Sequence, residues 1–211
     1  RVQGETPGGI AYSAKDPELL DWVSATAAYG FLTAYDTFVE RVPEADKTKY
    51  YAEAAPGAKL YGVQNSPMST ADFFKMMDKL VHRFESHVIN EEFLGIIMSG
   101  AAAPDTPKYI SRAMARASVS LLPPIVREKL GLGPKYNLSL VDRMTVKALG
   151  KYLNQKAIPG SPPCDASFRI GLPENFLYLG KRKRAEILAQ WRATGRKVPA
   201  PVATTSVQPA E

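Results

Sequence analysis

The chain has 211 residues, of which 45% are hydrophobic and 23% are charged. This balance is typical of a globular domain with its own apolar core, and it excludes a fibrous or globally disordered chain. The longest nearly uncharged runs, 93–104 and 117–125, are shorter than the roughly 20 apolar residues that a membrane-crossing helix needs. We therefore expect no transmembrane helix.

The first fifteen residues are rich in glycine and proline and predict a loop with one short extended piece around 10–13. Asp16 then offers a helix N-cap, and Pro17 occupies the favoured first helical position. Apolar residues recur every three or four positions from there to the segment before Pro43, which predicts a long central helix. We interpret Gly30, inside this helix, as a point of close approach by another helix.

The rest of the chain also shows helical periodicity, whereas strand patterns are scarce. The expected helices are 44–55, ended by Pro56-Gly57, a strong third helix at 70–90, and segments at 106–122, 124–130, 138–156 and 174–194. The sequence therefore predicts an all-α fold, a single multi-helix domain around a long central helix with an irregular C-terminal tail.

Composition suggests where the domain ends. We divide the chain into a helical domain at 1–156, a Pro-, Gly- and Ser-rich surface connector at 157–173, a basic helix at 174–197 and a Pro-rich tail at 198–211. The tail has too little apolar surface to fold alone, so we expect it to become ordered only against a protein partner.

The net charge of +6 is concentrated at the C-terminal end. Residues 181–211 contribute +5, and residues 1–180 contribute only +1. The sharpest run is Lys181-Arg-Lys-Arg184, which could contact nucleic acid or anionic lipid headgroups. A solvated helix face is the favoured interpretation, because Ile187, Leu188 and Trp191 give the same helix an ordinary apolar side. Nucleic acid is the less favoured partner, and peripheral membrane contact stays an alternative.

Cys164 is the only cysteine, which excludes an internal disulfide and any multi-cysteine zinc or iron–sulfur site, so no metal site is predicted. It lies in a turn-rich segment and we assign it no role. A single cysteine fits a reducing compartment. No signal-peptide pattern follows Arg1, and we expect the N-terminal part of the domain to lie upstream of it. The predicted location is cytoplasmic or peripheral to a membrane.

Several motifs follow one another in an order that carries a family resemblance. They are Arg1-Val-Gln-Gly4, Gly9-Ile-Ala-Tyr12-Ser-Ala14, Asp16-Pro-Glu-Leu-Leu-Asp-Trp-Val-Ser-Ala-Thr26, Lys49-Tyr50-Tyr51-Ala-Glu53, Leu60-Tyr-Gly-Val63 and Leu121-Leu-Pro-Pro-Ile-Val-Arg127 with Leu130-Gly-Leu132. Over roughly residues 1–150 the chain resembles the MpaB and rubber oxygenase (latex clearing protein) family, long catalogued as a domain of unknown function.

The resemblance implies an all-helical domain that holds haem b and uses dioxygen on apolar substrates such as polyisoprene and terpenoid chains. Where that family has the haem-ligating histidine of a Trp-Val-His-Ala-Thr pattern, this chain has Ser24. A hydroxyl is a poor replacement for imidazole as an iron ligand. Ser24 is thus a degenerate cofactor-binding position, and the resemblance places Arg1 near the haem pocket, as a propionate-side contact or a loop anchor.

No other residue clearly takes over ligation. His82 and His87 fall on the predicted third helix, five residues apart, so they do not share a face as a two-ligand pair would. Tyr29 and Tyr35 are phenolate ligands in one interpretation and core aromatics in the other. Catalytic residues are therefore not assigned.

Two functions follow. The first is a haem-oxygenase-like oxidoreductase acting on an apolar small-molecule substrate. The alternative is a haem-free member of the family that serves as a binding or structural subunit of a larger assembly.

Overall fold

The computed structural model describes residues 3–5, 9 and 11–195 of the chain. It confirms the all-α prediction. The only sheet in this part is a two-stranded antiparallel ribbon in which β1 (Gln3–Glu5) pairs with β2 (Ala11–Ser13), with Gly4 opposite Tyr12. The predicted extended piece around 10–13 corresponds to β2. The Pro-rich tail predicted at 198–211 lies outside the described residues.

The chain divides into two compact units, 1–151 and 152–211. The first contains α1 (Pro17–Phe38), α2 (Glu44–Leu60), α3 (Thr70–Leu80), the 3-10 turn η1 (Val81–Arg83), α4 (Val88–Ser99), α5 (Lys108–Ser120), α6 (Pro124–Lys129), the 3-10 turn η2 (Pro134–Tyr136) and most of α7 (Leu140–Asn154). The second contains α8 (Pro162–Arg169), the 3-10 turn η3 (Phe176–Tyr178) and α9 (Lys181–Ala193).

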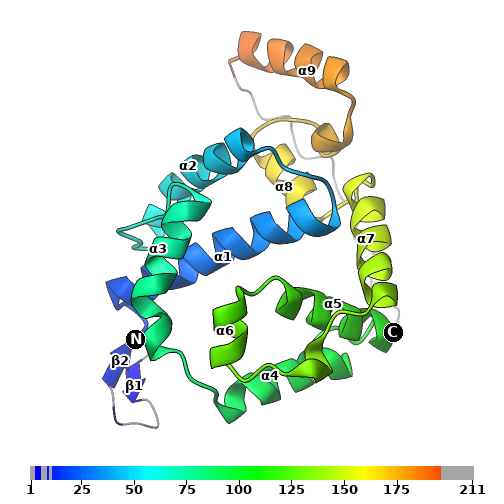
Figure 1. The fold of residues 1–211 in the computed structure, drawn as a ribbon. Helices are drawn as coiled ribbons and strands as arrows, with labels where there is room; N and C mark the ends of the chain where they lie inside the picture. The colour runs from blue at the N-terminus through cyan, green and yellow to red at the C-terminus, as the bar shows by residue number, and fades with distance from the viewer. Residues whose placement is uncertain (1–2, 6–8, 10, 196–211) are drawn as a thin grey trace, which may run out of the picture. The chain divides into compact units, whose positions relative to one another are not determined.

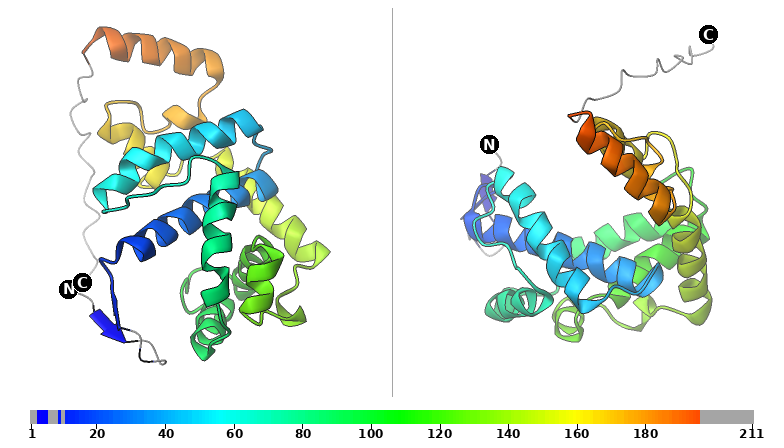
Figure 2. Two further views of the ribbon diagram at one scale, coloured as in Figure 1. Left: turned by 60° about the vertical axis from the view of Figure 1, so that its left-hand side comes forward. Right: turned by 90° about the horizontal axis from the view of Figure 1, so that it is seen from above.

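The central helix α1 begins as the sequence predicts. The Asp16 carboxylate accepts hydrogen bonds from the backbone N–H groups of Glu18 (2.9 Å) and Leu19 (3.2 Å), which satisfies two donors of the first turn. Helix α2 follows α1 after a short loop and runs back beside it, as Figures 1 and 2 show. Helix α3 also contacts α1.

One face of α1 is buried. Asp21, Ala25 and Leu32 lie along it, and the Asp21 carboxylate accepts hydrogen bonds from the backbone N–H groups of Gln64 (2.7 Å) and Asn65 (3.1 Å). The Asn65 side-chain amide donates to the same carboxylate at 2.8 Å. Asp21 therefore fixes the loop that follows α2 onto α1.

A second group of helices forms its own core within the first unit. Helices α4 and α5 lie side by side (Figure 1), and α5 continues through a tight turn into α6. Val119, Leu132 and Tyr136 form the buried centre, and Leu94, Met98, Leu122 and Leu130 pack against it.

Several predicted boundaries were wrong. The expected third helix, 70–90, is broken after Arg83, because Phe84 leaves the helical path and its ring meets Trp22 of α1 at 5.4 Å between centroids. Arg83 also forms an ion pair with Glu18. Contacts with α1 thus override the local periodicity.

Proline and glycine also proved weaker boundary signals than expected. Helix α2 continues past Pro56 to Leu60, although an internal proline removes one backbone hydrogen bond and crowds the preceding turn. The helix expected at 174–194 is instead η3 and α9, separated at the extended Gly180. Helix α8 lies inside the segment expected as a connector, and it buries Cys164 and Ser167.

Candidate functional site

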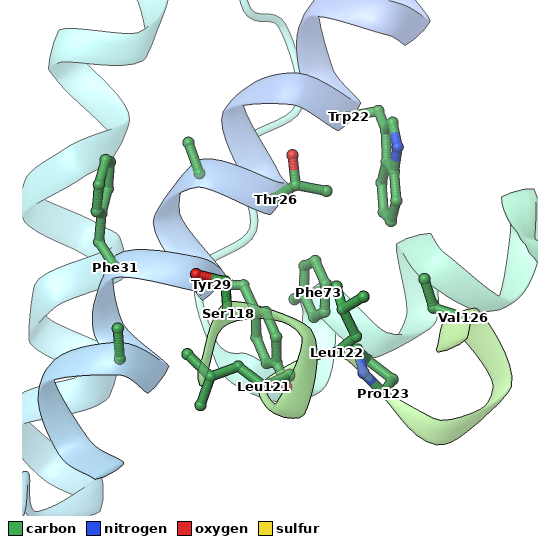
Figure 3. Close-up of a pocket in the computed structure, with 13 residues that line it drawn as sticks. Trp22, Thr26, Tyr29, Phe31, Phe73, Ser118, Leu121, Leu122, Pro123 and Val126 are labelled. Carbon is green, nitrogen blue, oxygen red and sulfur yellow. Dashed lines mark hydrogen bonds between the residues drawn. The ribbon is translucent and has the colours of Figure 1, made fainter. Parts of the chain in front are cut away.

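The side of α1 opposite to its buried face lines a pocket of about 390 Å³ within the first unit. This volume falls in the range of about 300–1,000 Å³ that is common for small-molecule sites. The lining residues come from α1, from α3, and from the end of α5 through the turn into α6 (Figure 3). They are Trp22, Thr26, Ala27, Tyr29, Gly30, Phe31, Ala34, Phe73, Ser118, Leu121, Leu122, Pro123 and Val126.

Three aromatic rings build one wall of this pocket. Phe73 stacks on Tyr29 with 4.1 Å between ring centroids and an interplanar angle of 6°, and on Trp22 at 5.9 Å and 10°. Phe73 is only 2% exposed, so α3 contributes a fixed surface. Phe31, by contrast, is 72% exposed and lies apart from the stacked rings at the rim of the pocket (Figure 3).

The hydroxyl groups of the lining are already engaged by the protein. Thr26 Oγ1 donates to the carbonyl of Val23 (2.9 Å), and Ser118 Oγ donates to the carbonyl of Met114 (3.0 Å). The Tyr29 hydroxyl donates to the carbonyl of Leu121 at 3.3 Å. These side chains therefore turn mainly carbon toward the pocket, and the Tyr29 bond also holds the α5–α6 turn against α1.

No Lys, Arg, Asp or Glu occurs among the described residues that line the pocket. Apart from the three hydroxyl groups described above, the polar side-chain atom of the lining is the indole nitrogen of Trp22. Because a charged ligand would be stripped of water here without a counter-charge, the pocket is suited to an uncharged, apolar molecule.

Gly30 lies in the middle of the α1 stripe that faces the pocket. A Cβ atom added to it would have no neighbouring atom within 4 Å, so no other helix approaches closely there. The interpretation of Gly30 as a close-approach glycine was therefore wrong. A glycine that does permit a close approach between helices is Gly150 of α7, where an added Cβ would lie 3.1 Å from Val39 Cγ2 and 3.3 Å from the Phe38 carbonyl oxygen.

Ser24, the predicted degenerate cofactor position, is half-buried on α1 and is not among the residues that line the pocket. It precedes Ala27 and Phe31, two lining residues, by three and seven positions, a spacing that places all three on one side of the helix. Arg1, the second predicted site residue, lies outside the described residues.

The other candidate ligands do not converge on the pocket. His82 belongs to the η1 turn, and His87 is the N-cap of α4, where its Nδ1 accepts a hydrogen bond from the Ile89 N–H (3.2 Å). The expectation that both lie on one helix was wrong. The Tyr35 hydroxyl donates to Glu40 at 3.5 Å, which leaves Tyr29 as the tyrosine of the lining.

Comparison with known families identifies the scaffold. A family model described as ER-bound oxygenase mpaB/B'/rubber oxygenase, catalytic domain, matches residues 1–154. The chain belongs to this family. Searches of curated proteins and of solved structures gave no match. The match covers the whole first unit and the end of α7, so α8 and α9 lie beyond the family's catalytic domain.

Members of this family are haem-dependent oxygenases in general, and the described pocket can be tested for a fit to haem. Its lining contains no His, Cys or Met, and Tyr29 is its sole side chain of a type that ligates haem iron. Burial raises the pKa of the Tyr29 phenol, against a smaller opposite effect of the Thr33 hydroxyl, so the phenolate form is disfavoured. No basic residue of the lining is available to pair with haem carboxylates. The described lining therefore does not fit an axially ligated haem.

The sequence indicated some of these residues without revealing their role. The Leu121-Leu-Pro-Pro element carries part of the family resemblance, and the pocket shows that it forms the wall facing α1. Phe73 falls within the expected third helix and Thr26 within the family motif, but nothing in the sequence places either residue in a pocket. One signal was present in the sequence. A glycine in the middle of a strongly periodic helix, as at position 30, lowers helix stability, which suggests that the position has a function other than helix formation.

In the described part of the chain no helix combines the length and apolar character needed to cross a bilayer. That part also contains no group of three or more His, Cys, Asp and Glu side chains placed to hold a metal ion.

Proposed function

We propose that this chain has an oxygenase-like role on an apolar small molecule, which it binds in the pocket beside α1. Membership of the oxygenase family supports the general role. The single observation that carries the choice of ligand is that each hydroxyl of the pocket lining already donates to a backbone carbonyl, while no charged group lines the pocket. Affinity in such a site comes mainly from the apolar area that the ligand removes from water.

A titration with a neutral fluorescent naphthylamine tests this proposal. The probe should bind saturably with one site per chain, and a neutral terpenoid chain should displace it. A carboxylate of the same length should displace it at least about tenfold less well, since its charge would be buried without a partner. Absence of saturable binding, or equal displacement by the neutral and charged competitors, would contradict the proposal.

The described residues favour a haem-free form of this function, in which the scaffold acts as a binding or structural subunit. This proposal is supported by the family resemblance, which implies that Ser24 replaces the ligating histidine, and by a pocket lining without His, Cys or Met. The second candidate is a haem-dependent oxidoreductase acting on the same class of substrate, and family membership is the observation that favours it.

A pyridine haemochrome assay on the purified chain, before and after incubation with haem, separates these two candidates. The haem-free form predicts far less than one haem per chain in both samples. The oxidoreductase predicts stoichiometric haem and oxygen consumption that depends on a terpenoid substrate.

A further inference from the structure

The positive charge of the protein lies in the second compact unit. Residues 152–211 contain nine Lys or Arg residues and four acidic residues. Residues 1–151 contain eighteen Lys or Arg residues and seventeen acidic residues, so their charges nearly cancel. The excess charge therefore belongs to the part of the chain that is almost entirely outside the match to the family's catalytic domain. This separation points to a role for the second unit that differs from ligand binding in the α1 pocket.

Four cations occupy the first turn of α9, which is the unfavourable end of a helix for positive charge. Lys181, Arg182, Lys183 and Arg184 follow the N-cap Gly180, which provides no side-chain hydrogen bond, and no acidic residue lies in this turn. The positive end of the helix dipole repels these charges. Because the cluster lowers the stability of its own helix, it is stronger evidence for a binding role than cations spread along a solvated face would be.

The protein itself compensates little of this charge. Glu186 is the acidic residue beside the cluster, and it accepts from Arg182 Nε at 3.2 Å and from Lys183 Nζ at 3.5 Å. The Arg182 side chain nevertheless remains 95% exposed. Among the described residues, Lys181 and Arg184 form no ion pair. The cluster is thus available to an external anionic partner.

Exposed apolar side chains also occur in the second unit. Leu177 of η3, four residues before Lys181, is 50% exposed, and Ile170, at the end of α8, is 53% exposed. The Ile170 carbonyl accepts a hydrogen bond from Trp191 Nε1 (2.7 Å), which fixes the C-terminal part of α9 against the end of α8. The unit therefore exposes both cations and apolar side chains, and of these apolar residues Leu177 is the one near the cluster in sequence.

We propose that the second unit docks on an anionic lipid bilayer through Lys181–Arg184, with Leu177 entering the interfacial layer. Cations near a bilayer surface are attracted by anionic headgroups, and an apolar side chain gains by leaving water at the same interface. A nucleic acid would satisfy the four cations and would offer no comparable environment to Leu177. This proposal does not depend on the identity of the ligand in the α1 pocket.

Vesicle co-sedimentation of the full chain tests the proposal. We expect binding to vesicles of phosphatidylcholine with phosphatidylserine, little binding to phosphatidylcholine alone, and weakening as salt is raised. The variant K181Q/R182Q/K183Q/R184Q should bind the anionic vesicles at least about 100-fold more weakly, because each basic residue near the surface contributes several-fold to binding. L177S should lower binding to the same vesicles by a few-fold, including at high salt.

A second quadruple variant, K59Q/K79Q/K147Q/K151Q, provides a matched control. It removes the same total charge from four exposed lysines of the first unit and should bind vesicles like the unchanged protein. The α9 variant should fold at least as well as the unchanged protein, because it removes cations from the N-terminal turn of a helix, and circular dichroism would verify this.

Three results would overturn the proposal. Equal losses in the two quadruple variants would indicate a response to net charge alone. Undiminished vesicle binding by the α9 variant would exclude the cluster as the site that contacts the bilayer. Binding of single-stranded RNA that is tighter than vesicle binding at the same salt, and that disappears in the α9 variant, would assign the cluster to nucleic acid instead.

Discussion

Replacing Gly30 by alanine should stabilise the protein, and replacing it by phenylalanine should close the pocket. A glycine in a helix interior costs about 0.8–1.0 kcal/mol relative to alanine. An added Cβ at position 30 meets no atom within 4 Å, so the alanine variant should gain this amount without a steric penalty. For a chain of 211 residues this corresponds to an increase in Tm of about 2–4 °C.

The phenylalanine variant should keep the fold and lose ligand affinity. Its ring would extend into the cavity of about 390 Å³ that Gly30 lines. If the ring displaces about 100 Å² of apolar contact from the ligand, the loss is about 2.5 kcal/mol at 25 cal/mol per Å². That loss is a reduction in affinity of more than tenfold, which the neutral naphthylamine titration would detect.

Gly57 of α2 is a suitable control for both changes. An added Cβ at this position also meets nothing within 4 Å, and Gly57 does not line the pocket. Gly57→Ala should give a comparable or smaller gain in Tm, and Gly57→Phe should leave probe affinity unchanged. The reasoning would be refuted if Gly30→Ala lowered the Tm, or if Gly30→Phe bound the probe as tightly as the unchanged protein.

Three further substitutions test contacts that α1 makes with its neighbours. Gly150→Ala should lower the Tm, because its Cβ would lie 3.1 Å from Val39 Cγ2, and a rise equal to that of Gly30→Ala would contradict the assigned close approach. Phe73→Ala should cost about 3–5 kcal/mol in urea unfolding, since the ring is buried and stacks on Tyr29, and a loss below about 1 kcal/mol would exclude this packing. Burial alone would raise the pKa of Asp21. The hydrogen bonds that its carboxylate accepts from the loop have the larger combined effect, so the pKa is lowered from its ordinary value of 3.8. The stability contributed by this carboxylate is therefore complete above about pH 4 and declines as pH falls through the lower folded value. Asp21→Asn should lose about 1–3 kcal/mol at neutral pH and show a flatter stability profile below pH 4, and an unchanged acid profile would count against this role.

Local sequence signals predicted the elements that depend on local chemistry. The cap at Asp16, the proline at position 17 and the spacing of apolar residues correctly predicted a long helix that starts at Pro17 and ends before Pro43. The break between α3 and α4 was not predictable in this way. It depends on the contact of Phe84 with Trp22, residues 62 positions apart, and no local pattern specifies that contact.

The pocket illustrates the same difference. The family resemblance singles out Ser24, a residue of one helix. The cavity, in contrast, is formed by side chains of α1, α3 and the α5–α6 region, which are separate in the sequence. The sequence could not show that Leu121 meets Tyr29, since the hydrogen bond between them joins residues 92 positions apart. Gly30 could be noticed from sequence as a weak point in a strong helix. Its interpretation required knowing that the space beside it is open.

The central claim is that the oxygenase scaffold keeps an apolar pocket whose lining provides no haem ligand. A haem titration of the full chain, followed by visible absorption, tests it most directly. We predict no stoichiometric Soret band characteristic of an axially ligated haem. A band that saturates at one haem per chain, and that is lost in Tyr29→Phe, would contradict the claim.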